Sequence, residues 1–548
     1  MTDPETNRDR SRALALSLGA LCVATAVAAA AAFLPHQSLW NDEATQLSGL
    51  SLSPASQAYW LAGMERHDFG VSDDRMPPLS YWIGWAWSRL FGLGEASMRS
   101  LGVVAVAAAT ALVFAAGTRA WGLGAGTAAA LLLGASPNIV GTAVEIRTYP
   151  LFVLSSAGLF HSLVRLLDDP PERGARWLAA MAAWSIAGAY LHFFGLVAAG
   201  AAFLAALILV PMRGGRLVPV LAACLVVGIA ACGLWPFVSV AVRRLDAASV
   251  AGEPAAVRPS ISVKAVARLA YRLVFHAAMR TSRVATAAGA LGLVLASLAC
   301  LPSTSRGREA RLGLWVAWAS GTLVVLASAF VTPLDVLASR YNVWMYPATA
   351  LILGSGLASR LPAARWATAA GVSLLVASML WGDVVLATRG DDFAHTGFAL
   401  LDDAVRRLGV DRVAVVFDET DPEAAWQLYA PLRYRYRGRL RQYIRDQPAA
   451  DGVRVRGYPK GDGPIDPDSI PAEELIVVRC GSINADDLIA QLHGGYREFG
   501  DGPVASRLKA SPGWVLEEEG HTLTYFPAEI DILARKAGKP AAAAPPAP

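Results

Sequence analysis

The chain has 548 residues, of which 54% are hydrophobic and only 17% are charged. Soluble proteins carry about 25% charged residues, so this composition excludes an ordinary soluble protein. The net charge of +4 is too small to indicate a nucleic-acid partner. The five cysteines are scattered without a CxxC pair, and this spacing indicates neither a disulfide framework nor a zinc site.

Repeated apolar runs, each long enough to cross a lipid bilayer, follow a short polar tail at residues 1–12. The first run lacks a small-residue cleavage site, which favours a retained helix over a cleaved signal. Almost no polar loop separates two of the runs at residues 192–195, so a tight turn is required there. We predict about eleven transmembrane helices, at residues 13–34, 98–118, 124–143, 149–166, 176–193, 195–211, 216–241, 284–302, 312–331, 342–359 and 366–387.

In a chain with eleven spans, the arginines of the short connections all lie on the same side of the membrane as the N-terminus. Basic residues concentrate in cytoplasmic loops, so we predict a cytoplasmic N-terminus in a multi-pass protein of the cell (inner) membrane. The arginines are Arg8, Arg10, Arg12, Arg119, Arg165, Arg173, Arg176, Arg213, Arg216, Arg306, Arg308, Arg311, Arg360 and Arg365.

The first outer loop, residues 35–97, contains a run at 79–91 that is too short to cross a bilayer of about 30 Å. The run is rich in Trp and Tyr, so we predict a helix on the outer membrane surface. Residues 243–283 mix basic and apolar residues and predict a second surface segment, whose natural partners are anionic membrane lipids or a lipid phosphate.

The composition changes after the transmembrane domain, which we place at residues 13–387. We predict a soluble extracytoplasmic α/β domain at 388–538, followed by a disordered Pro/Ala-rich tail at 539–548. Its predicted elements are a strand at 412–417, a helix at 421–429, a strand at 474–478, a helix at 486–492 and an edge strand at 522–526.

Several polar and aromatic residues lie close to the predicted membrane boundary on the outer side. They are Asp42, Glu43, Asp74, Arg75, Arg147, Tyr149, His192, Arg340 and Tyr341. Each type also has a plain structural interpretation: acids in a helix's first turn or a turn cap, snorkelling arginines, an aromatic belt, or a histidine packed at a helix end. For each residue alone both interpretations stand, but the set gathers on one side. We expect no comparable acid–base set along the cytoplasmic side.

Together these residues suit group transfer from a lipid phosphate. A carboxylate can accept a proton from an acceptor hydroxyl or orient it. Guanidinium groups can bind a phosphate and stabilise it as it leaves. The alternative is a transporter or flippase for lipid-linked sugars, which predicts polar broken helices near the midplane and paired repeats. No internal repeat is evident in the sequence.

Short motifs in a fixed order resemble landmarks of the GT-C superfamily of polyprenyl-phosphate-sugar-dependent membrane glycosyltransferases. The likeness is to the branch of the protein O-mannosyltransferases and the lipid A aminoarabinose transferases. It covers residues 13–360, through WNDEA at 40–44, RMPPLSYW at 75–82, SMRSL at 97–101, EIRTY at 145–149, YLHF at 190–193 and SRY at 339–341.

The resemblance implies roles for the outer-side residues. Asp42 would be the catalytic or acceptor-orienting acid, and Glu43 would support it. Arg75, Arg147 and Arg340 would bind the donor phosphate. The remaining four, Asp74, Tyr149, His192 and Tyr341, would line the cavity.

Met76 departs from the family pattern, since many members have His before Pro-Pro, and this puts any role of that His in doubt. The resemblance implies no obligatory metal, and a divalent cation stays open because related oligosaccharyltransferases need one. We therefore expect a glycosyltransferase that moves a hexosyl or pentosyl group with inversion, from a polyprenyl-phosphate donor to a glycolipid, polysaccharide or protein of the cell envelope.

Overall fold

A computed structural model describes most of the chain. Arg75, the predicted helix at 486–492, the predicted strand at 522–526, the tail 539–548 and most of segment 243–283 lie outside the described residues. The described residues are 4–67, 69, 74, 76–250, 282–299, 307–331, 336–337, 339–388, 397–418, 422–446, 453–458, 464–480, 502–521 and 528–536.

The chain divides into two compact units, and each is built from separate pieces of sequence. The first unit comprises Met1–Pro35, Leu52–Arg66 and Arg75–Thr388. The second comprises His36–Ser51, His67–Asp74 and Arg389–Pro548. Part of the predicted outer loop therefore belongs to the same unit as the C-terminal residues.

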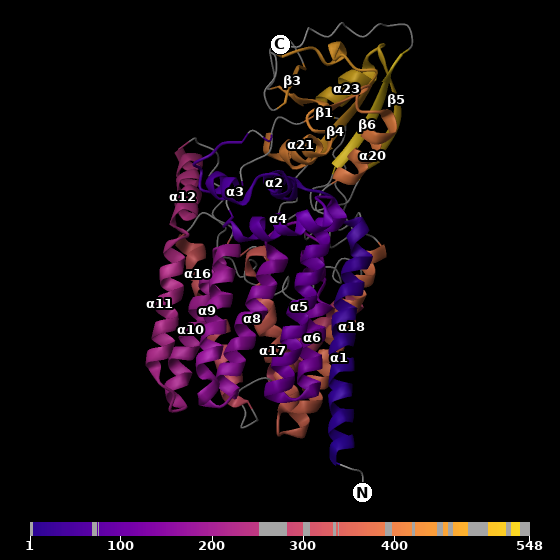
Figure 1. Cartoon of the computed structure of the whole chain (residues 1–548). Helices are drawn as coiled ribbons and strands as arrows, with labels where there is room; N and C mark the ends of the chain where they lie inside the picture. The colour runs from indigo at the N-terminus through magenta and orange to yellow at the C-terminus, as the bar shows by residue number, and fades with distance from the viewer. Residues whose placement is uncertain are drawn as a thin grey trace. The chain divides into compact units, whose positions relative to one another are not determined.

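The first unit is helical, and its long helices run roughly parallel to one another (Figure 1). Its elements are α1 (Pro4–Phe33), η1 (Leu34–His36), α3 (Pro54–Leu61), α4 (Leu79–Phe91), α5 (Glu95–Trp121), α6 (Leu123–Gly134), α7 (Pro137–Ala143), α8 (Tyr149–Asp168), η2 (Pro171–Arg173), α9 (Gly174–Leu191), α10 (Phe194–Met212), α11 (Leu217–Cys232), α12 (Trp235–Val250), α15 (Arg283–Ala299), α16 (Arg308–Val331), η3 (Ser339–Asn342), α17 (Met345–Ser355), η4 (Gly356–Ala358) and α18 (Pro362–Thr388).

Six stretches of the described chain are long and apolar enough to cross a membrane: Ser11–His36, Glu95–Trp121, Tyr149–Asp168, Phe194–Met212, Arg308–Ala329 and Pro362–Thr388. Two bent helix pairs, α6 with α7 and α11 with α12, raise the number to eight if each pair is one span. The chain is therefore a multi-pass helical membrane protein, and the count of eleven spans stays a prediction. The short helix α4 has the predicted bounds, Leu79–Phe91, and lies across the long helices (Figure 1).

Two of the predicted single runs are broken helices. The run at 124–143 bends by 61° between α6 and α7, where Pro137 begins the second helix. The run at 216–241 bends by 53° between α11 and α12, close to Pro236. Proline lacks the backbone N–H that would continue a helix, so each bend has a local cause in the sequence.

Small residues allow the helices to approach closely, as they do in other membrane bundles. A Cβ at Gly292 of α15 would lie 2.6 Å from the carbonyl oxygen of Gly371 in α18. A Cβ at Gly117 of α5 would lie 2.8 Å from the Cα of Gly126 in α6. Both contacts are with backbone, so neither position has room for a larger residue.

The second unit is an α/β unit with a six-stranded sheet in the order β3-β2-β1-β4-β6-β5. β1 pairs in parallel with β2 and β4, and the remaining pairs are antiparallel. Its elements are α2 (Asn41–Gly49), α20 (Phe398–Leu408), β1 (Val413–Phe417), α21 (Pro422–Tyr436), β2 (Arg441–Arg445), β3 (Val455–Gly457), η5 (Pro467–Ser469), β4 (Glu474–Cys480), α23 (Pro503–Ala510), β5 (Trp514–His521) and β6 (Ala528–Arg535).

The central position of β1 in this sheet agrees with the burial of its side chains. All five residues of β1 are buried, as expected for a parallel strand covered on both faces. Asp418 follows β1 and is 3% exposed. Its Oδ2 accepts hydrogen bonds of 3.0 Å from the backbone N–H groups of Val504 and Ala505, in the first turn of α23. This carboxylate therefore joins the end of β1 to the start of a helix about 85 residues later.

Candidate active site

An aromatic cluster surrounds the buried side chain of His192, where α9 ends and α10 begins. The imidazole stacks on Phe152 of α8, with ring centroids 5.2 Å apart. Tyr149, the first residue of α8, lies 5.8 Å from it, and Tyr341 of η3 lies 5.6 Å from it. Three segments that are distant in the sequence thus bring Tyr149, His192 and Tyr341 together.

Backbone geometry fixes the orientation of the imidazole. His192 is extended, and its backbone N–H donates to the carbonyl of Gly188 at 2.9 Å. Its Nδ1 lies 3.2 Å from the backbone N–H of Phe194 and accepts from it. A neutral imidazole has one donor and one acceptor nitrogen, so this contact assigns the proton to Nε2. The turn also brings Gly195 against Gly188, where no side chain fits.

A guanidinium group borders this cluster. The Cζ of Arg340 lies 5.2 Å from the centroid of the Tyr341 ring, within cation–π range. Its Nη2 is 3.4 Å from the hydroxyl of the same tyrosine. Arg340 is half-buried, so a phosphate at this end of the bundle would meet a positioned cation beside aromatic faces.

A second arginine is buried in the segment between α7 and α8. Arg147 is 7% exposed. The next residue, Thr148, donates its hydroxyl hydrogen bond to the carbonyl of Leu191 at 2.7 Å and so ties the start of α8 to the end of α9. Arg99 of α5 is also buried, and its Nη1 donates to the carbonyl of Val144. Arg99 lies in the motif SMRSL at 97–101, from which no role for it is predicted.

Asp42 and Glu43 lie in the first turn of α2, in the second unit. Glu43 is fully buried and Asp42 is half-buried. Their position suits the positive end of a helix dipole, so the plain interpretation of these acids fits the local geometry. Asp74 also belongs to the second unit and is buried.

The structure thus brings together four of the predicted site residues, Tyr149, His192, Arg340 and Tyr341. Arg147 belongs to the same unit, whereas Asp42, Glu43 and Asp74 belong to the other. Within the described residues, no group of three or more His, Cys, Asp or Glu side chains could hold a metal ion.

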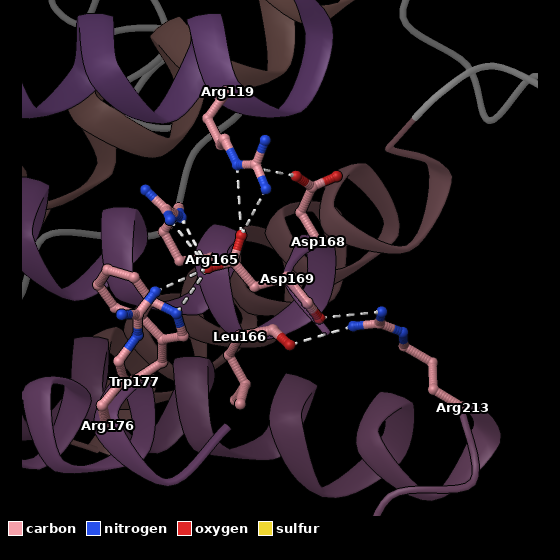
Figure 2. Close-up of polar contacts among 8 residues, drawn as sticks. All are labelled: Arg119, Arg165, Leu166, Asp168, Asp169, Arg176, Trp177 and Arg213. Atoms are coloured by element: carbon pink, nitrogen blue, oxygen red, sulfur yellow. Dashed lines mark hydrogen bonds and ion pairs between the residues drawn. The ribbon is translucent and has the colours of Figure 1, made fainter. Parts of the chain in front are cut away.

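An acid–base set also lies at the helix ends that the arginine pattern predicts to be cytoplasmic, where we expected none. Asp169, directly after α8, has its carboxylate surrounded by Arg119, Arg165 and Arg176 (Figure 2). In the sequence these arginines indicate orientation only. They come from α5, α8 and α9, and the approach of those helix ends is not visible in the sequence. Burial of the Asp169 carboxylate opposes its charge, but hydrogen bonds from Arg165, Trp177 and Arg119 hold its pKa well below the usual range.

Comparisons with known proteins bear on the fold and the family. Residues 75–239 match the family described as dolichyl-phosphate-mannose-protein mannosyltransferase. The crystal structure of ArnT from Cupriavidus metallidurans bound to undecaprenyl phosphate is similar, with a TM-score of 0.51, 14% identity and coverage of 96% of this chain and 99% of that one. The resemblance to the GT-C superfamily is confirmed.

Two further structures are less similar to this chain. The apo state of the same ArnT gives a TM-score of 0.40 at 14% identity, with 96% and 99% coverage. The oligosaccharyltransferase of Archaeoglobus fulgidus gives 0.40 at 11% identity, covering 69% of this chain and 56% of that one. TM-scores below 0.5 are too low to support a fold assignment, so the assignment of the fold depends on the first comparison. A search of curated proteins gives no significant match. The family match at residues 75–239 supports, in general, a glycosyltransferase that uses a lipid-linked sugar, and the comparison with ArnT supports the fold alone.

Proposed function

We propose that the protein transfers a sugar from a polyprenyl-phosphate donor to a cell-envelope acceptor at the outer face of the inner membrane. The family match at residues 75–239 and the GT-C fold support sugar transfer in general. The structural neighbour was solved with undecaprenyl phosphate, which supports a polyprenyl-phosphate donor. The acceptor is a glycolipid, a polysaccharide or a protein.

The observation that carries the proposal is the cluster of Arg340, Tyr341, His192 and Tyr149 at one end of the bundle. Arg340 lies over one aromatic ring of this cluster, and a guanidinium group is well suited to bind a phosphate. Aromatic faces provide an apolar surface next to these polar donors. A lipid phosphate with a sugar attached presents the matching chemistry, a charge next to a partly apolar ring.

The reaction is a displacement at the anomeric carbon. The acceptor oxygen forms a bond to that carbon while the bond between the carbon and the phosphate oxygen breaks, which inverts the configuration. The acceptor proton passes to the carboxylate of Asp42, and the polyprenyl phosphate leaves with the bonding electron pair. Arg75, Arg147 and Arg340 stabilise the charge that develops on the leaving phosphate.

The other predicted residues have supporting roles. Glu43 is buried next to Asp42 in α2 and supports its position. Tyr149, His192 and Tyr341 form an aromatic surface for the donor, and Asp74 stays a predicted cavity-lining residue. No metal is assigned a step, because arginines can stabilise a leaving phosphate without one.

The test uses a strain from which the gene has been deleted. Mass spectrometry of its envelope glycolipids, polysaccharides and glycoproteins should show one sugar lost, and the wild-type gene should restore it. Asp42→Asn should insert into the membrane at wild-type levels but restore none of the sugar. Asp403→Asn, an exposed acid of the same unit, is the matched control and should restore it fully. Full restoration by Asp42→Asn would refute the role of Asp42, and an unchanged sugar profile on deletion would refute the proposal.

A further inference from the structure

The Asp169 cluster lies at the opposite end of α8 from the candidate active site. Tyr149 begins this helix of 20 residues, and Asp169 follows its last residue. At 1.5 Å per residue the two sites are about 30 Å apart, the thickness of the hydrocarbon core of a bilayer. The Asp169 cluster is therefore at the other membrane boundary and takes no part in the proposed transfer.

A single carboxylate at this boundary accepts hydrogen bonds from four side chains (Figure 2). The Nη2 of Arg165 lies 2.8 Å from Asp169 Oδ2, and that of Arg176 lies 3.2 Å from the same oxygen. The Nη2 of Arg119 lies 3.1 Å from Oδ1. Trp177 donates its indole N–H to Oδ2 at 3.0 Å and stacks against both Arg165 and Arg176. The carboxylate itself is 1% exposed.

Positive charge is in excess here. Arg213 joins the cluster by donating to the carbonyls of Leu166 at 3.1 Å and Asp169 at 3.4 Å. Within the described residues, three guanidinium groups thus pair with two carboxylates, those of Asp169 and Asp168, and the fourth, that of Arg213, donates to backbone carbonyls. Tying the helices together needs one guanidinium per carboxylate, so this structural role does not account for the surplus.

The surplus donors face outward. The side chain of Arg119 is 43% exposed and that of Arg176 is 52% exposed, in contrast to the buried carboxylate. A guanidinium carries five N–H donors. Within the described residues, the Nη1 of Arg119 and the Nε and Nη1 of Arg176 make no hydrogen bond. Asp169 therefore holds two guanidinium groups in fixed positions with donors left for an anion.

The surroundings of the cluster indicate a lipid. Leu204, Ile208 and Met212 are spaced four residues apart on α10, and their exposed fractions are 42%, 43% and 73%. Residues at this spacing form one stripe along a helix, which here leads to Arg213 at the helix end. An acyl chain along this stripe would place its headgroup at the cluster, and Trp177 lies at the depth where interfacial tryptophans are common.

We propose that the Arg119–Arg165–Arg176–Arg213 cluster binds the phosphate of an anionic glycerophospholipid. Basic pockets between transmembrane helices bind such headgroups in other membrane proteins, each basic residue contributing an attraction of about 1 kcal/mol. That attraction corresponds to about a fivefold change in affinity for each guanidinium removed. The charges of the neighbouring exposed residues Arg173 and Glu172 roughly cancel, so they do not alter the excess of positive charge in the cluster.

The experiment uses the purified full-length protein in detergent. Its unfolding midpoint is measured against increasing phosphatidylglycerol, phosphatidylcholine or inorganic phosphate. Phosphatidylglycerol should raise the midpoint at low concentration, and the other two should not. In the double variant Arg119→Gln/Arg176→Gln the half-saturating concentration should rise by about 25-fold. The control Arg360→Gln, exposed in the connection before α18, should respond like the wild type.

The outcomes are distinct. An equal response to phosphatidylcholine, a wild-type response of the double variant, or an equal loss in Arg360→Gln would overturn the lipid site. A full response to inorganic phosphate would replace the lipid with a soluble anion and overturn it as well. If the double variant does not fold, Arg176→Gln alone leaves three donors on Asp169 and should still shift the half-saturating concentration by about fivefold. Native mass spectrometry should show one fewer phosphatidylglycerol retained.

Discussion

The turn that holds His192 depends on the absence of a side chain at Gly195. A Cβ there would lie 2.2 Å from the carbonyl carbon and 2.3 Å from the carbonyl oxygen of Gly188, and 2.5 Å from the amide nitrogen of Ala189. Ordinary contacts begin near 3.4 Å, and all three atoms are backbone. Gly195→Ala therefore forces α9 and α10 apart by about 1 Å, at a cost of about 1–3 kcal/mol.

The rate of sugar transfer should fall as well, because the displaced helix ends carry His192. A misplacement of about 1 Å in a catalytic site can cost about 100-fold in rate. The unfolding midpoint in detergent and the sugar transfer restored to a deletion strain are the two measurements.

Gly200→Ala is the matched control for this substitution. Gly200 is on the same helix with nothing within 4 Å of its Cβ position. Alanine is preferred to glycine in a helix by about 0.5–1 kcal/mol, so this variant should be at least as stable as the wild type. If Gly195→Ala matched Gly200→Ala in both midpoint and transfer, the close approach at this turn would be refuted.

Two further substitutions test the buried carboxylates. Asp169→Asn should destabilise the protein by about 3–5 kcal/mol at neutral pH, because it leaves partly buried arginines without their counter-charge. The pKa of Asp169 is lower in the folded state, so its contribution is present above about pH 4 and declines below that. The difference in unfolding free energy between wild type and variant should shrink by about 1.4 kcal/mol per pH unit below about pH 4, and a constant difference would contradict the ion pairing. Asp418→Ala should remove the hydrogen-exchange protection of Val504 and Ala505 and destabilise the second unit by about 3 kcal/mol, whereas the exposed Asp403→Ala should do neither.

Sequence reasoning was most accurate where local chemistry decides the structure. The bounds of α4 matched because Pro78 and Gly92 flank a run of thirteen residues. This run is rich in Trp and Tyr and is too short to cross a bilayer. The turn at His192 followed from the absence of a polar loop. The strand ending at Phe417 followed from an uninterrupted β-branched and apolar run.

Contacts between distant segments were not predictable in the same way. Arg165 and Asp169 are four residues apart, a spacing at which helical side chains can pair, but the approach of Arg119 and Arg176 depends on how three helix ends pack. Arg99 reaches a carbonyl 45 residues away, and no local pattern indicates that distance. The membership of Asp42 in the C-terminal unit likewise depends on tertiary packing.

The division of the second unit has a consequence for biosynthesis. α2, with Asp42 and Glu43, packs against α21, which begins at Pro422. The ribosome adds about 5–20 residues per second, so α2 leaves it some tens of seconds before its packing partner exists. During that interval the buried face of α2, including the Glu43 carboxylate, has to be kept from premature contacts. A nascent chain that stops before α21 would therefore contain Asp42 and Glu43 but not the helix against which α2 packs.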